Sequence, residues 1–166
     1  MTKSKTGAAT RPTATAERQL AGFINKFDTR NAALIRSVRR VLRKRMPSAN
    51  ELIYDNYNFF VIGYCSTERP SDCIVSIAAA ANGVGLSFYY GATLADPQKL
   101  LLGSGGQNRF IRIDSAAVFK RAGIGALIAA AIAQAKKPLP QRGKGKLIIR
   151  SISKKQKLRR KAKANG

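Results

Sequence analysis

The densest group of polar and aromatic side chains precedes the first strand pattern of the chain. It comprises Glu51, Tyr54, Asn56 and Tyr57. A carboxylate, an amide and two phenols at the mouth of a sheet could line a pocket and orient a small ligand there. The alternative is structural: Glu51 caps or pairs with a basic residue of the preceding helix, while the tyrosines cover the edge of the core. The sequence leaves both interpretations open.

A glycine-rich segment, Gly103-Ser104-Gly105-Gly106, is a second candidate for ligand binding. Backbone amides in such a loop can cradle an anion, and Arg109 would add a fork of N–H donors. The segment leads into a predicted strand, however, and so lacks the helix N-terminus of phosphate-binding loops. A plain tight turn is therefore the favoured interpretation.

The residue types argue against an enzyme. The chain has no histidine, the commonest general acid–base residue, and no serine in a nucleophile-elbow pattern. Cys65 and Cys73 flank a predicted turn and could face each other across two strands, but two thiols without histidine are an incomplete zinc site. We expect free thiols, no metal, no cofactor and no catalytic residues. Without a segment resembling a signal peptide, a reducing cytoplasmic compartment is the expected location.

The formal net charge of +23 is concentrated at the C-terminal end, where residues 136–166 contain 13 Lys and Arg and no Asp or Glu. Such a segment attracts polyanions, because neutralised phosphates release their condensed counterions. We predict a disordered basic tail that binds nucleic acid without sequence preference. Acidic lipid is the rival polyanion, and a merely solvated tail is the bland alternative. An apolar island at 147–152 could dock as a strand. The expected contact residues are Lys154, Lys155, Lys157, Arg159, Arg160, Lys161 and Lys163.

The elements that must position these residues follow from hydrophobic periodicity. A helical pattern begins at Glu17, and a second helix, capped by Asp28 or Thr29, ends before Pro47. Residues 48–57 are interpreted as a turn or half-helix. The remaining expected elements are strands at 59–65, 72–80, 84–90 and 107–113, a hairpin turn at Asn82-Gly83, a short helix at 96–102 and a final helix at 116–135.

This order of elements predicts an α+β two-layer sandwich. An antiparallel sheet of about four to five strands would carry the helices on one face. Residues 1–16 lack periodicity and are expected to be disordered, so that residues 17–135 would form a domain that folds without either end.

Three stretches of this domain resemble the YdhG-like domain, a bacterial family of largely unknown function. They are MPSANELIYDNYNFF at 46–60, GVGLSFYY at 83–90, and LLLGSGGQNRFIRI at 100–113 followed by an alanine-rich helix. The resemblance covers about residues 17–135 and implies a frataxin-like fold. It also implies, for one branch of the family, a link to iron delivery.

The chain departs from the family at the positions where ligand contacts would be carried over. Gln107 stands where the family often has lysine, and Asp55 and Asn56 stand where it often has glycine and proline. Iron also prefers clustered oxygen ligands, whereas the eight acids here are scattered. The sequence therefore predicts a non-catalytic binding module with a tail that engages nucleic acid. The alternative is a small-ligand or iron carrier whose tail is incidental.

Overall fold

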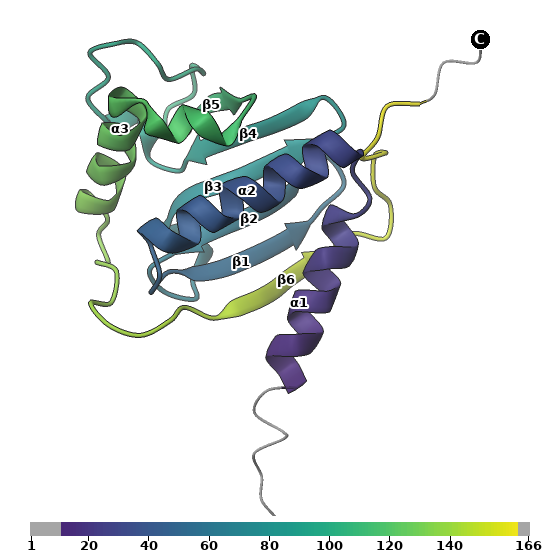
Figure 1. Cartoon of the computed structure of the whole chain (residues 1–166). Helices are drawn as coiled ribbons and strands as arrows, with labels where there is room; N and C mark the ends of the chain where they lie inside the picture. Colours follow the sequence, from purple (N-terminus) through teal and green to yellow (C-terminus); the bar gives the residue numbers. More distant parts are fainter. Residues whose placement is uncertain (1–10, 163–166) are drawn as a thin grey trace, which may run out of the picture.

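The computed structural model describes residues 11–162 and shows three α-helices packed against a six-stranded sheet (Figure 1). The helices are α1 (Arg11–Ile24), α2 (Thr29–Arg45) and α3 (Ala122–Ala133). The strands are β1 (Asn50–Asp55), β2 (Phe60–Cys65), β3 (Cys73–Ala80), β4 (Gly83–Phe88), β5 (Arg109–Ile113) and β6 (Leu147–Ile152).

The sheet has the strand order β5-β4-β3-β2-β1-β6. Neighbouring strands are antiparallel except for β1 and β6, which run parallel. All three helices share one hydrophobic cluster with the sheet and lie on the same face of it (Figure 1). The predicted α+β architecture with helices on one face is confirmed, but the sheet is mixed and larger than the predicted antiparallel sheet of four to five strands.

Helix α2 crosses the sheet and illustrates why the helical predictions succeed. Asp28 caps its first turn by accepting a hydrogen bond from the Asn31 amide at 2.7 Å. Ile35, Val38 and Leu42 recur at helical spacing and are fully buried against the strands. Apolar residues on one face and cations on the other therefore fix both the helix and its orientation.

Three local predictions are wrong for identifiable reasons. Residues 50–55 are a strand. Its alternation of apolar and polar residues is hidden in the sequence, because two charged residues, Glu51 and Asp55, occupy buried positions that face the helices. Residues 96–102 contain no helix: the Asp96 side chain accepts hydrogen bonds from the amides of Leu100 and Leu101 and closes a turn. The expected helix at 116–135 is a 3₁₀ helix over 116–120 followed by α3.

The predicted domain boundaries are also wrong. Residues 11–16 belong to α1, whereas residues 1–10 lie outside the described part of the chain. At the other end β6 pairs with β1, and the segment after it continues to bond the same strand: the Ser153 amide donates to the Asp55 carbonyl and the Lys157 amide to the Tyr57 carbonyl, both at 2.9 Å. The folded domain thus includes most of the predicted tail, and no disordered segment separates 136 from 162.

Removing β6 and the residues after it tests this boundary. We expect a chain ending at Lys146 to lose cooperative unfolding, because β1 would lose its parallel partner and the buried Asp55 carboxylate would lose Arg159. Thermal unfolding followed by far-UV circular dichroism provides the measurement. A chain ending at Ala162 is the control and should melt like the full chain. A chain ending at 146 that melts within a few degrees of full length would contradict this boundary.

Candidate nucleic-acid interface

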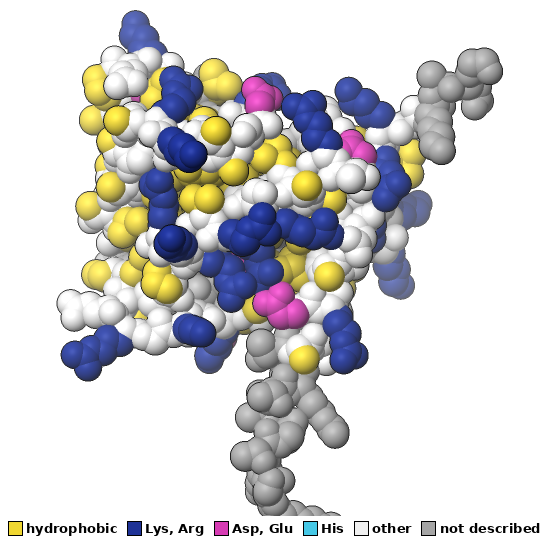
Figure 2. Space-filling model, in the orientation of Figure 1, with side chains coloured by type: hydrophobic (Ala, Val, Ile, Leu, Met, Phe, Trp, Pro, Cys, Tyr) yellow, Lys and Arg dark blue, Asp and Glu magenta, His cyan; other side chains and the backbone are white. Residues whose placement is uncertain are grey.

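Cations gather on the helix-covered face of the molecule. Helix α2 alone carries seven Lys and Arg residues in 17 and no Asp or Glu. Figure 2 shows Lys and Arg side chains across this face, with Asp and Glu only at scattered points. Because the apolar side of α2 is buried, its cations are forced outward into one band.

The eight acidic side chains are too few to neutralise this surface, and two of them, Glu51 and Asp55, are buried. Arg39 of α2 bonds Glu17 and Glu51 together, with all four N···O distances between 2.9 and 3.1 Å. Hydrogen bonding to Arg39 is the main reason why the pKa of Glu17 lies below its ordinary value. Asp55 bonds Lys26 at 2.7 Å and Arg159 at 3.0 Å. Among the described side chains of residues 14–162, only five Lys or Arg lie within 4.0 Å of a carboxylate; they are Lys26, Arg39, Arg43, Lys146 and Arg159.

A groove of about 580 Å³ lies between the C-terminal turn of α2 and the loop that enters β6. Four of its lining side chains are cations, Arg43 and Lys44 from the helix and Lys144 and Lys146 from the loop. Its carboxylates, Glu17 and Glu51, are the two that Arg39 holds. We call these four cations and the space between them the basic groove.

Gly145 explains how two distant segments form this groove. Its amide donates to the Pro47 carbonyl at 2.9 Å, and a Cβ at this position would collide with the Ala49 carbonyl. Only glycine permits this close crossing, which sets Lys144 and Lys146 beside the end of α2. Sequence reasoning missed the basic groove because its halves lie about 100 residues apart; the signal available was the run of cations without acids in α2.

The polar–aromatic cluster does not form a site. Glu51 points into the helix-covered side, where Arg39 and the Tyr64 hydroxyl bond it. Tyr54 lies on the opposite face of β1, packed against a small separate cluster. Asn56 accepts a hydrogen bond from the Ser151 hydroxyl at 2.7 Å, and Tyr57 is half exposed with the Lys157 ammonium 5.7 Å from its ring centre. The structural alternative, pairing of Glu51 with the second helix, is therefore the one observed.

The glycine-rich loop does not act as an anion cradle either. Arg109 donates to the carbonyls of Gly105 and Asn108, so carbonyls rather than amides face its guanidinium. Gly103 has a φ of +109°, a value that favours glycine. Gly105 and Gly106 are exposed, and a Cβ added at either would meet no atom within 4 Å. Residues 103–109 form a loop closed by the bridge between Leu102 and Phe110, with hydrogen bonds of 2.8 and 3.0 Å, and this loop is longer than the predicted tight turn.

The predicted tail residues divide into bound and free cations. Arg159 is buried on Asp55, and Arg160 donates to the carbonyls of Asn25 and Lys26. Both side chains therefore hold other parts of the domain, and the contact of these residues with nucleic acid stays a prediction. Lys163 lies outside the described residues. Arg160, Lys154, Lys155, Lys157 and Lys161 are exposed, and of these Arg160 alone bonds backbone carbonyls of the turn after α1.

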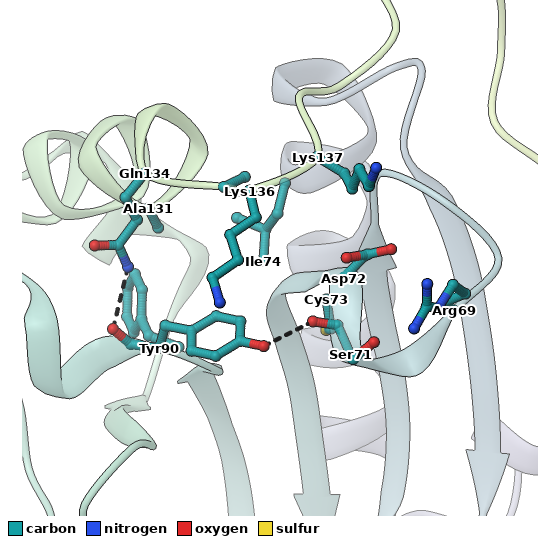
Figure 3. Close-up of a pocket in the computed structure, with 12 residues that line it drawn as sticks. Arg69, Ser71, Asp72, Cys73, Ile74, Tyr90, Ala131, Gln134, Lys136 and Lys137 are labelled. Carbon is teal, nitrogen blue, oxygen red and sulfur yellow. Dashed lines mark hydrogen bonds between the residues drawn. The ribbon is translucent and has the colours of Figure 1, made fainter.

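A smaller pocket of about 230 Å³ lies where α3 ends over β3 and β4 (Figure 3). Ile74 and Phe88 contribute apolar surface, and Arg69, Lys136 and Lys137 contribute positive charge. In Figure 3 the Lys136 side chain extends toward the ring of Tyr90, whose hydroxyl donates to the Ser71 carbonyl at 2.9 Å. The pocket is small, and its charged lining is three cations and one carboxylate, Asp72.

Cys65 and Cys73 are both buried, and their thiols are not joined in a disulfide. Cys65 and Cys73 are register partners on β2 and β3, as the sequence predicted they could be. Hydrogen bonding to Cys73 and burial raise the pKa of Cys65, so that thiol stays protonated at neutral pH. Among residues 11–162, no three His, Cys, Asp or Glu side chains gather as metal ligands. Within the same range, no helix is long and apolar enough to cross a bilayer.

Known proteins offer no parallel from which a role could be transferred. No family model, curated protein or solved structure matches this chain. The charge, burial and geometry of its own residues therefore have to carry any functional assignment.

The ion pair beneath this surface gives a prediction about stability. Burial raises the pKa of Asp55, but the contacts from Lys26, Gln156 and Arg159 outweigh burial and leave the pKa below its ordinary value. A carboxylate with a lowered folded pKa stabilises fully above its unfolded pKa, about 3.9, and loses that contribution as the pH falls toward the folded pKa.

We therefore expect Asp55→Asn to cost about 3–5 kcal/mol at pH 7, because it leaves the Arg159 guanidinium buried without a counter-charge. The penalty should shrink as the pH is lowered below about 4. Urea unfolding across pH 3–7 measures both effects, and Asp114→Asn, which changes an exposed carboxylate, is the control. A penalty that is independent of pH would show that the charge of Asp55 is not what stabilises this junction.

Proposed function

We propose that this protein is a non-catalytic binding module that engages nucleic acid through its phosphates, without sequence preference. One observation carries the proposal: α2 carries seven cations and no acid, and the basic groove at its end sets four cations against two carboxylates, Glu17 and Glu51. Phosphate contacts from Lys and Arg supply sequence-independent affinity.

The groove and the C-terminal cations belong to the same module. Arg160 fastens the C-terminal segment to the turn between α1 and α2, so the free lysines at 154, 155 and 161 lie near the start of α2 while the basic groove lies at its end. This arrangement differs from a flexible tail, because most of the cations sit on a rigid surface. Less conformational entropy is then lost when phosphates are bound.

The resemblance to the YdhG-like domain remains part of this proposal. Two N-terminal helices packed on a sheet, followed by a final alanine-rich helix, support it. A frataxin-like arrangement is the finer form of the same proposal. We do not extend the family's link to iron to this proposal, because several of the acids, such as Glu17, Glu51 and Asp55, are engaged in ion pairs and do not gather as ligands.

A second candidate function is a carrier of a small organic anion. The specific observation that favours it is the pocket of Figure 3, where Lys136 and Tyr90 converge above an apolar floor. Inorganic phosphate or a phosphate monoester is the appropriate probe. Calorimetric binding that Lys136→Ala abolishes, without any change in duplex binding, would favour this candidate.

The basic groove gives the test of the nucleic-acid proposal. Lys44→Ala and Lys144→Ala together should weaken binding of two unrelated DNA duplexes by the same factor and reduce the slope of log K against log salt by about two. Neither lysine is in an ion pair within residues 11–162, so the fold should be unaffected. Fluorescence anisotropy over a range of salt provides the measurement.

Lys120→Ala removes an exposed cation that lines no part of the groove and serves as the control. Vesicles containing phosphatidylserine distinguish acidic lipid from nucleic acid as the polyanion. A flat salt dependence, or a preference for one duplex that the double variant abolishes, would contradict the proposal.

A further inference from the structure

The face of the sheet opposite the helices is uncovered. Within residues 11–162 no helix packs on it, and its only buried cluster is small, with Leu52, Cys65 and Cys73 at its centre. An antiparallel sheet commonly leaves one face to solvent, but this face carries a half-exposed phenylalanine, Phe59, which is a feature of contact surfaces. This face is therefore a candidate surface for binding a partner.

Cross-strand pairing shows how the face is made. One row runs Tyr54, Val61, Ala78, Gly85 and Arg112 across five strands, each residue opposite the next. The neighbouring row runs Leu52, Gly63, Ser76, Ser87 and Phe110. The middle of both rows is therefore small, and the larger side chains stand toward the outer strands.

The result is a trough of about 660 Å³ with Ala78 and Gly85 on its floor. Phe59, of which 51% is exposed, lies on one side, and Phe110 and Arg112 lie on the other. Phe59 lies beside a floor of small residues, Ala78 and Gly85. Its ring is therefore accessible for contact with a flat ligand. We call this trough, with Phe59, Phe110 and Arg112, the sheet platform.

We propose that the sheet platform binds single-stranded nucleic acid, with unpaired bases stacked on Phe59 and Phe110 and phosphates contacted by Arg112. This rests on the proposed function and adds the class of nucleic acid and the surface that selects it. Stacking on aromatic side chains requires bases whose faces are free, which a duplex does not offer.

Charge identifies nucleic acid as the occupant rather than a second copy of the chain. Two copies that each carry +23 would repel one another when brought face to face, whereas a polyanion is attracted. Both outer strands of this face contribute an exposed arginine, Arg112 on β5 and Arg150 on β6, the latter close to Tyr54. The only carboxylate that lines the trough is Asp114, at its end.

The experiment compares a fluorescent twelve-nucleotide oligothymidine with a twelve-base-pair duplex, using the full chain. Phe59→Ala should weaken binding of the single strand by roughly 5- to 100-fold, the range expected for one stacked base, and change duplex binding less than about two-fold. Phe110→Ala should act in the same way. Leu158→Ala shortens another exposed apolar side chain, 74% exposed and outside the trough, and should change neither.

Phe59→Trp keeps the inference testable if the alanine variants fold poorly. Because the natural chain has no tryptophan, this variant gives one fluorophore on the platform. Its emission should be quenched by the oligothymidine in proportion to binding and should hardly respond to the duplex. Unchanged emission on saturation with the single strand would overturn the inference.

The outcomes separate the inference from the proposed function. If neither oligonucleotide binds the natural chain, both fail. If both bind and the Phe59 and Phe110 variants bind the single strand as tightly as the natural chain does, the platform alone is overturned. If sedimentation shows a dimer that Phe59→Ala dissociates while single-strand binding is unchanged, the trough is a surface for self-association and the inference is wrong.

Discussion

Asp55 is fully buried at the end of β1, and the two ends of the domain meet on its carboxylate. Lys26 reaches it from the turn after α1, and Arg159 reaches it from the segment after β6. A buried carboxylate left without partners would cost several kcal/mol, so each contact depends on the others being made. The pairing of β6 with β1 and the docking of α1 therefore both depend on the Asp55 carboxylate.

Glu51 repeats the arrangement at the start of the same strand. Arg39 holds both Glu51 and Glu17, which ties β1 to α2 and α1 to α2. The single positive charge of Arg39 offsets only one of these two carboxylates, so the group keeps a net charge of −1 beneath the cations of α2. The helical surface is positive because its cations outnumber its carboxylates, with seven Lys and Arg and no Asp or Glu in α2.

The sequence predicted those elements that are stabilised by interactions between residues close together in the chain. The stripe of Ile35, Val38 and Leu42, the Asp28 cap and the Asn82-Gly83 turn were all predicted and found. Strand β1 could not be found in this way, and for residues 147–152 the sequence indicated that they could dock as a strand but not which strand they pair with. Buried carboxylates hide the alternation of β1, and β6 pairs with β1 in parallel across about 90 residues, a distance over which no turn signal reports. The basic groove depends on that pairing and was missed with it.

The two proposed surfaces lie on opposite layers of the sandwich, which makes their electrostatics nearly independent. A helix is about 10 Å across, while the screening length at physiological salt is roughly 8 Å. Cations of the basic groove therefore act weakly on a strand lying on the sheet platform. In the proposed binding mode, phosphates there would be neutralised mainly by arginines of that face, such as Arg112, whereas the stacking energy depends little on salt. If both proposals hold, added salt should therefore weaken duplex binding, which rests on phosphate contacts alone, more than single-strand binding.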